Sequence, residues 1–373
     1  MRNLLAALLV CAPALMAQAP ATALKPAPIV SPQVLPDRRV VFRLRAPKAA
    51  DVTIAGDFWV QEGRSEQMVK GDDGVWSLTT DRLLPDLYSY WFTIDGVPAP
   101  DPSNRVHKQG SRTQQSMFTV PGADEAFLEN SAVPHGEVRI VYYPSAALGS
   151  NQRMHIYFPP AYDNSKTQYP VVYLLRGGGD EDWGWVTVGR VNMILDNLIA
   201  AGNAKPMIVV MPNLWTPATP TAGSPLEENA ARFDKSLFED VIPFVESHYR
   251  VLPGVANRAA GGLGAGRYHL SELLWANVDK FSSFVFVSGG SDAEHVAGFD
   301  KQYPDEINKP ANAKRVKVFL GDGKNDASYS YSTHLAAELK QRGYSVTTYA
   351  TEGTHGWPSF RRCFAEWAQS AFR

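Results

Sequence analysis

Residues 169–179 read YPVVYLLRGGG, and this stretch decides the fold. Its first seven residues form a nearly continuous apolar run, which is typical of a strand buried on both faces of a parallel sheet. A second such run, MIVVM, follows at residues 207–211. Between the two runs, apolar side chains recur at helical spacing over residues 191–199. Because parallel strands are joined by crossovers, the pattern predicts a strand–helix–strand unit.

The alternation of strands and helices continues to the carboxyl end of the chain. We expect strands at residues 257–262, 281–287, 315–320 and 345–350, and helices over residues 233–245 and 333–342 and from Ser359 onward. This order predicts a doubly wound α/β sheet, whose functional residues lie at the carboxyl ends of the strands.

Residues 38–122 have a different character. Short β-rich runs such as YSYWFTI at residues 88–94 alternate with turns rich in glycine and aspartate, such as GDDG at residues 71–74. Strands at this spacing predict a β-sandwich. The chain is therefore expected to hold an all-β sandwich over residues 38–122 and an α/β domain over residues 135–373, joined by a linker over residues 123–134.

The first residues predict export. Arg2 precedes an apolar run too short to span a bilayer, so residues 1–23 are interpreted as a signal peptide and residues 24–37 as a linker. Cleavage would leave Cys363 as the single cysteine, so no internal disulfide is expected. We expect the protein in a periplasm or outside the cell, without membrane insertion, and its oligomeric state stays open.

Charge and motif spacing exclude several other functions. The formal net charge of −2 gives no electrostatic reason to expect nucleic acid as a partner. The glycines at residues 177–179 do not form the G-x-G-x-x-G pattern that opens a dinucleotide-binding helix. No zinc-type spacing joins His135, His155, His248 and His269. We therefore expect no cofactor and no metal.

Four short motifs fall at predicted strand ends. RGGG at residues 176–179 follows the buried strand, and GLGAG at residues 262–266 lies at a strand-to-helix turn. GKND at residues 323–326 follows a late strand, and THGWP at residues 354–358 precedes the last helix. In this order they match the oxyanion loop, the nucleophile turn, the acid and the base of an α/β-hydrolase.

The segment from residue 134 to the end resembles the esterase D type family, which includes feruloyl and acetyl-xylan esterases. The resemblance is carried by PHGEVRIVYYPSAALGSNQRMHIYFPPAYD, YPVVYLLRGGG, DVIPFVESHYRV and THGWPSFR. Upstream, YSYWFTIDGVPAPDPSN at residues 88–104 resembles the immunoglobulin-like module of glycogen-binding type. Together they imply an α/β-hydrolase domain behind an immunoglobulin-like sandwich, with a polysaccharide or an acylated oligosaccharide as partner.

The resemblance assigns catalytic roles to particular residues. Asp326 would be the acid and His355 the base of a triad. The backbone N–H groups of Ala265 and of Gly177 or Gly178 would form the oxyanion hole. The alternative is that Asp326 and His355 persist as a structural pair without a chemical task.

Three positions depart from the family pattern. Gly264 stands where the family has its catalytic serine, and without a side chain it cannot form an acyl-enzyme. Loss of the nucleophile from a triad typically costs on the order of 10⁶ in turnover. Arg176 replaces the histidine of the oxyanion loop, and Arg267 follows the nucleophile turn where the family keeps a small residue.

The two arginines admit two interpretations. Arg176 and Arg267 would converge on an anionic group, such as the carboxylate of a uronic acid, through bidentate hydrogen bonds. Alternatively they pair with the nearby acidic residues Asp180, Glu181 and Glu272.

Tryptophans are the candidate sugar contacts, because their flat rings stack on sugar faces. In the sandwich, the resemblance makes Trp59, Trp76 and Trp91 candidates. We expect Trp59, in a loop, to make such a contact, and the alternative for Trp76 and Trp91 is a place in the core, which we favour. The candidates in the α/β domain are Trp183, Trp215 and Trp357.

The leading hypothesis is a pseudo-esterase that binds polysaccharide or acylated oligosaccharide without cleaving it. One alternative is an active ester hydrolase, of feruloyl or acetyl-xylan esterase type, in which His355 activates a water in the space at Gly264. A second alternative is a protein-interaction scaffold in the cell envelope.

Overall fold

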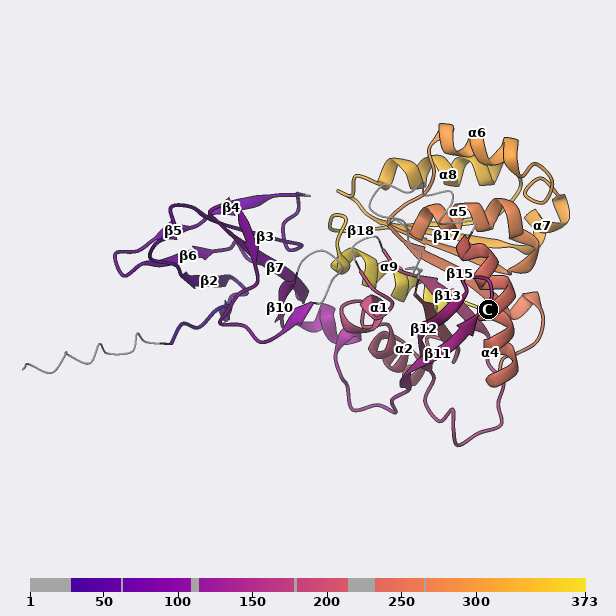
Figure 1. The fold of residues 1–373 in the computed structure, drawn as a ribbon, viewed down its shortest axis with the longest axis horizontal. Helices are drawn as coiled ribbons and strands as arrows, with labels where there is room; N and C mark the ends of the chain where they lie inside the picture. Colours follow the sequence, from indigo (N-terminus) through magenta and orange to yellow (C-terminus); the bar gives the residue numbers. More distant parts are fainter. Residues whose placement is uncertain (1–27, 62, 109–113, 178–179, 214–231, 265) are drawn as a thin grey trace, which may run out of the picture.

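The computed structural model describes residues 28–61, 63–108, 114–177, 180–213, 232–264 and 266–373. A smaller all-β unit lies beside a larger α/β unit (Figure 1). The predicted fold class is therefore confirmed, whereas the predicted signal peptide lies outside the described residues. No described helix is long and apolar enough to cross a bilayer.

The smaller unit consists of two antiparallel sheets. One has the strand order β1-β2-β6-β5, and the other has the order β4-β3-β7-β10-β9 with β8 paired to β7. The bounds are β1 (Gln33–Val34), β2 (Val40–Arg45), β3 (Val52–Gly56), β4 (Ser65–Gln67), β5 (Val69–Lys70), β6 (Val75–Thr79), β7 (Asp86–Ile94), β8 (Val97–Ala99), β9 (His107–Lys108) and β10 (Gln115–Val120). β1 lies within residues 24–37, which were predicted to be a linker, and it pairs with β2.

Alternating side chains of the two sheets form the core of the smaller unit. Phe42 of β2 and Tyr90 and Phe92 of β7 are all completely buried. Their rings pack against each other, with centroids 4.7 Å apart for Phe42 and Tyr90 and 5.8 Å apart for Tyr90 and Phe92. This inward set leaves the residues between them, such as Trp91, on the opposite face of the sheet.

The larger unit is built on one sheet with the strand order β11-β12-β14-β13-β15-β16-β17-β18. Its strands are β11 (Glu137–Ser145), β12 (Ser150–Phe158), β13 (Val171–Leu175), β14 (Ile208–Pro212), β15 (Arg258–Leu263), β16 (Ser283–Val287), β17 (Lys317–Gly323) and β18 (Ser345–Thr351). From β14 to β18 neighbouring strands are parallel. The chain runs from β13 outward to β14 and then back past β13 to β15, so a ligand crevice is expected at the carboxyl ends of β13 and β15.

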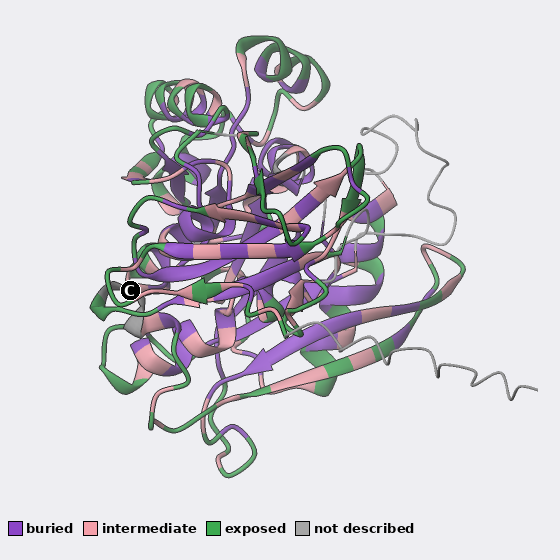
Figure 2. Cartoon of the chain, turned by 90° about the vertical axis from the view of Figure 1, so that its left-hand side faces the viewer, coloured by how far each residue is buried: buried purple, intermediate pink, exposed green. Residues whose placement is uncertain are grey.

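Helices cover both faces of this sheet, with α2 on one side and α5 and α8 on the other (Figure 1). The helices are α1 (Gly184–Thr187), α2 (Val191–Ala200), α4 (Ile242–His248), α5 (Gly266–Asn277), α6 (Ala293–Gln302), α7 (Pro310–Arg315), α8 (Tyr329–Gln341) and α9 (Trp357–Ser370). Val172 of β13 packs in the same core as α2 and α9, while Tyr173 packs in the core that contains α5 and α8. The strands between the helices are accordingly buried (Figure 2).

The two units share a core and a buried ion pair. Leu87 of β7 and Met117 of β10 belong to the hydrophobic cluster that α9 forms with the large sheet. Beside them, Nη2 of Arg361 in α9 lies 2.6 Å from Oδ1 of Asp86 in β7, and these side chains are 0% and 1% exposed. Arg361 also donates to the carbonyl oxygens of Val188, at 2.9 Å, and of Leu87. The smaller unit is therefore fixed on the larger one.

Replacing Arg361 by methionine is expected to lower the free energy of unfolding by up to about 3–5 kcal/mol, because the buried carboxylate of Asp86 would keep only the partly exposed Arg362 as an ion-pair partner. Chemical denaturation followed by tryptophan fluorescence measures the loss. The control is Arg39→Met, which breaks an exposed ion pair with Asp37 and should cost at most about 1 kcal/mol. Equal losses in the two variants would contradict the role of the buried pair.

Candidate active site

The turn after β15 contains Gly264, which was predicted to occupy the nucleophile position. Gly264 has φ +54°, in the left-handed region that most residues avoid. Its N–H donates to the carbonyl oxygen of Val287 at 3.3 Å. Two residues on, a Cβ built at Gly266 would lie 2.6 Å from the carbonyl oxygen of Arg176, so this close approach requires glycine.

The acid and the base predicted from the sequence meet at the carboxyl ends of the strands. Nδ1 of His355 lies 3.2 Å from both carboxylate oxygens of Asp326. Asp326 is 5% exposed, and His355 precedes α9 at the edge of a cavity. A proton on Nδ1 that faces Asp326 leaves Nε2 as the acceptor nitrogen of the ring.

Ser288 is a third member of this group that the sequence analysis missed. Its hydroxyl donates to Oδ2 of Asp326, and its oxygen lies 2.6 Å from Nδ1 of His355. Since a hydroxyl carries one proton, Ser288 must accept from His355 while it donates to Asp326. Ser288 is completely buried and follows β16 directly, so its place at a strand end was the signal that could have identified it.

The charge of Asp326 is stabilised by its neighbours. Burial alone would raise the pKa of Asp326, but its hydrogen bonds with His355 and Ser288 and the charge of His355 hold this pKa below the usual value. The carboxylate is therefore suited to orient His355 and to stabilise a proton on its ring.

The space at residue 264 faces the base. A Cβ built on Gly264 would lie 3.5 Å from Nε2 of His355 and 3.9 Å from Cα of Gly177. Both are ordinary contact distances, so a serine side chain has room beside the base. A small molecule such as water in this space would also lie within reach of His355.

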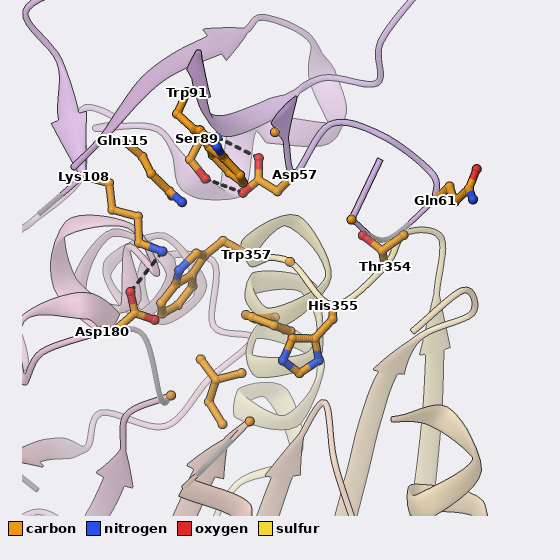
Figure 3. A pocket seen from close by; sticks show the side chains of 17 residues that line it. Asp57, Gln61, Ser89, Trp91, Lys108, Gln115, Asp180, Thr354, His355 and Trp357 are labelled. Carbon is orange, nitrogen blue, oxygen red and sulfur yellow. Dashed lines mark hydrogen bonds and ion pairs between the residues drawn. The ribbon is translucent and has the colours of Figure 1, made fainter. Parts of the chain in front are cut away.

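Both units line the cavity above Gly264, which has a volume of about 480 Å³ (Figure 3). The larger unit contributes Gly177, Asp180, Leu263, Gly264, Thr354, His355, Gly356, Trp357 and Phe360. The smaller unit contributes Gly56, Asp57, Gln61, Gly63, Ser89, Trp91, Lys108 and Gln115. The site is thus a crevice between the units, and the smaller unit forms one of its walls.

Two polar contacts fix the side chains of this wall. Nζ of Lys108 lies 3.0 Å from Oδ1 of Asp180, an ion pair that joins the two units, and 5.9 Å from the ring centre of Trp357. The carboxylate of Asp57 accepts hydrogen bonds from the N–H and the hydroxyl of Ser89, both at 2.7 Å. Burial raises the pKa of Asp57, although the hydrogen bonds from Ser89 oppose this shift.

Arg176, one of the predicted ligand contacts, has other partners. Arg176 is 6% exposed, and its Nη1 donates to the carbonyl oxygens of Gly177 at 2.7 Å and Asp180 at 2.6 Å. Burial lowers the pKa of Arg176 to about 10, against the nearby charges of Glu181 and Asp180. Arg176 therefore braces the loop that follows β13, and its proposed contact with an anionic ligand gains no support.

Two of the three sandwich tryptophans do not lie where the sequence predicted. Trp59 is only 9% exposed and packs in the core against Phe58, so the expectation that it forms an open sugar platform was wrong. Trp76 lies in the core as expected. Trp91 was expected in the core but lines the cavity, because it alternates with the inward-facing Tyr90 and Phe92.

In the larger unit, Trp357 lines the cavity, with its ring perpendicular to that of Trp185 at 5.2 Å. Trp183 instead lies under the guanidinium of Arg153, at 4.7 Å. Of the other predicted site residues, Gly178, Trp215 and Ala265 lie outside the described residues, as does the side chain of Arg267. Within the described ranges, no group of three His, Cys, Asp or Glu side chains is placed to hold a metal ion.

Comparisons with known protein families match both units. Residues 145–369 match the family described as "Putative esterase", and residues 30–105 match carbohydrate-binding module 48, the isoamylase N-terminal domain. An endo-1,4-beta-xylanase/feruloyl esterase of Xylanibacter ruminicola is 30% identical over 340 residues, or 89% of this chain and 44% of that protein. Endo-1,4-beta-xylanase Y of Acetivibrio thermocellus is 31% identical over 208 residues, or 52% of this chain and 18% of that protein. The chain thus spans less than half the length of these curated relatives.

Solved structures share the fold. A ferulic acid esterase of Anaeromyces mucronatus superimposes with a TM-score of 0.57 at 22% identity, over 67% of this chain and 96% of that one. An enterobactin esterase of Shigella flexneri superimposes with a TM-score of 0.66 at 16% identity, over 89% of this chain and 92% of that one. The predicted esterase-like fold with an amino-terminal carbohydrate-binding module is therefore confirmed.

A second buried carboxyl group lies close to the acid of the site. Asp322 in β17 is 2% exposed and accepts a hydrogen bond from the hydroxyl of Ser332 at 3.0 Å. Burial, together with the charge of Asp326, raises the pKa of Asp322 to about 7. Between pH ~4 and ~7 the folded chain therefore keeps a proton on Asp322, whereas the unfolded chain has released it.

Asp322→Asn is expected to make stability less dependent on pH. Between pH ~4 and ~7 the native state binds the additional proton, so the free energy of unfolding of the unmodified chain falls as pH rises through this window. The variant should gain up to about 4 kcal/mol relative to the unmodified chain at pH 8, with little gain at pH 4. Denaturant titrations at both pH values measure this difference, and the exposed Asp81→Asn serves as control. A gain of equal size at both pH values would contradict the raised pKa.

Proposed function

We propose that this chain, which belongs to the esterase family matched above and carries a carbohydrate-binding module, is an exported pseudo-esterase. It binds polysaccharide or acylated oligosaccharide in the crevice between its two units and does not form an acyl-enzyme. The observation that carries this proposal is Gly264, which stands where the family resemblance expects a serine and has φ +54°.

The cavity supports binding for reasons that do not depend on the missing serine. Aromatic and polar side chains from both units converge on it, among them Trp91, Gln115 and Trp357. Such a combination is typical of sugar-binding sites, because rings cover the apolar faces of sugars while amides and charged groups bind hydroxyls. The similarity to an endo-1,4-beta-xylanase/feruloyl esterase makes a feruloylated xylo-oligosaccharide the first ligand to test.

One observation favours a second candidate, slow hydrolysis without an acyl-enzyme. The space at Gly264 lies 3.5 Å from Nε2 of His355, measured from the built Cβ, and Asp326 still orients this ring. A water there would attack the ester carbonyl while Nε2 takes its proton. The same nitrogen would return the proton to the departing alcohol, which leaves a free acid.

Ester turnover and ligand binding, measured on the same preparation, separate the two candidates. We expect feruloylated xylo-oligosaccharide to bind in calorimetry and no release of ferulate above that of His355→Ala. Release that His355→Ala abolishes, and that serine-directed reagents do not affect, would instead establish the water route. Absence of binding and of turnover would contradict both candidates.

Gly264→Ser is expected to create ester hydrolysis that depends on His355. The new Oγ would lie next to Nε2, and the backbone already has the φ that the turn requires. Release of p-nitrophenol from p-nitrophenyl acetate, and its inhibition by a serine-directed reagent, measure the gain. Gly264→Ala is the matched control, because it introduces the same Cβ at φ +54° without a hydroxyl. Equal activity of the serine and alanine variants would contradict the assigned geometry.

A further inference from the structure

The crevice contains an ion pair between Lys108 and Asp180. This pair takes no part in the roles predicted for Asp326 and His355. Lys108 belongs to β9 of the smaller unit, and Asp180 belongs to the loop after β13 of the larger unit. Their side chains are 13% and 9% exposed, and both residues line the cavity. This charge pair therefore joins the two units, and it is also positioned to contact a ligand in the cavity.

We propose that Lys108 and Asp180 together bind two adjacent hydroxyl groups of an uncharged sugar unit, an inference that rests on the proposed function. Each sugar hydroxyl can both donate and accept a hydrogen bond. The Lys108 ammonium donates to one hydroxyl, and the Asp180 carboxylate accepts from its neighbour. Because both side chains are charged, both hydrogen bonds are of the stronger, charge-assisted kind.

Asp180 has acceptor capacity to spare for such a ligand. Oδ1 of Asp180 is buried and faces the Lys108 ammonium at 3.0 Å. A carboxylate has about four acceptor sites on its two oxygens, so Asp180, which lines the cavity, can accept from a ligand hydroxyl while it keeps this ion pair. The ammonium has three donors, and the ion pair occupies one side of it.

The neighbouring side chains extend this pair into a row across the sheet. Gln115 pairs directly with Lys108 in register, and the pairing of Ser116 with Tyr90 places Trp91 next to Gln115 on the other side. The row Trp91, Gln115 and Lys108 therefore lies on one face of the sheet. Figure 3 shows these side chains on one wall of the cavity, with Trp357 and His355 on the other. A sugar held by Lys108 and Asp180 would thus have an aromatic ring and an amide beside it.

The charges around the cavity favour an uncharged sugar over an acidic one. Among the described lining residues, Lys108 is the one lysine or arginine, and Asp180 already balances it. Asp57 lies on the same wall, and Asp326 lies behind His355. A ligand carboxylate would add a negative charge to a site with no unbalanced cation in the described lining. This argument replaces the uronic acid expected from Arg176.

Calorimetry on the full chain tests the proposal with two matched probes, xylotriose and xylotriose carrying one glucuronic acid substituent. We expect the unmodified chain to bind the uncharged probe more tightly. Lys108→Met should weaken its binding about tenfold, which corresponds to the loss of one charge-assisted hydrogen bond. Lys108→Arg should retain most of the affinity, and Lys48→Met, at an exposed position of the same unit, should change nothing.

Asp180→Asn provides the sharper readout, because it removes the charge that balances Lys108. We expect this variant to lose about tenfold in affinity for xylotriose and to bind the acidic probe more tightly than the unmodified chain does. A variant that merely loosened the loop would lose affinity for both probes. Weaker binding of xylotriose together with tighter binding of the acidic probe therefore separates a binding role of Asp180 from a structural one.

The possible outcomes distinguish this inference from the proposed function. If xylotriose binds and Lys108→Met and Asp180→Asn behave like Lys48→Met, the inference is overturned and the proposed function stands. Equal losses for both probes, or a preference of the unmodified chain for the acidic probe, would also overturn the inference. If neither probe binds to any form of the chain, the inference is overturned, and calorimetry with the feruloylated xylo-oligosaccharide then decides the proposed function separately.

Discussion

The buried ion pair between Arg361 and Asp86 determines how the rest of the site is arranged. Both charges lie out of contact with water in the docked arrangement, so a shift of the smaller unit that separated them without exposing them would leave a buried charge without this partner. Arg361 belongs to α9, the helix that begins at Trp357 directly after the loop of His355. The helix α9, which follows His355 directly, therefore also contacts the carbohydrate-binding module through Arg361. Docking of the module and the shape of the crevice depend on the same helix, because Trp357 and His355 both line the cavity.

Packing around the turn at Gly264 explains the conformation of its backbone. A residue with a side chain at the φ of Gly264 would be strained by roughly 1–2 kcal/mol, so glycine is the most comfortable residue there. The turn nonetheless retains its shape, since α5 must begin close to the loop after β13, where Gly266 approaches Arg176. The junction of strand and helix requires this backbone, whichever side chain it presents. Asp326, His355 and Ser288 are likewise joined by hydrogen bonds among themselves, through Nδ1 of the His355 ring.

The sequence predicted the local elements well because their signals are local. The apolar run of β13, the helical spacing of α2 and the motifs around Asp326 and His355 all depend on short windows of the chain. The contribution of the smaller unit to the crevice could not be predicted in this way, since Lys108 and Asp180 are far apart in the chain and meet only when the units dock. Trp59 and Trp91 were misplaced because a loop position suggested exposure and an apolar strand suggested burial. In the structure, packing against Phe58 buries Trp59, and alternation along β7 turns Trp91 outward to the cavity.

Catalysis and binding make different demands on this crevice. A nucleophile lowers the free energy of the transition state. Contacts with sugar rings and hydroxyls instead stabilise the bound ground state and the transition state to a similar extent. Glycine at residue 264 offers no interaction of the first kind, whereas side chains suited to contacts of the second kind line the cavity. The side chains of the second kind come largely from the smaller unit, with Trp91, Gln115 and Lys108 on one wall. The buried charge pair between Arg361 and Asp86 holds this wall in place relative to His355. The side chains suited to bind a sugar and the predicted acid and base thus lie largely on different units, so the proposed binding does not require a serine at residue 264.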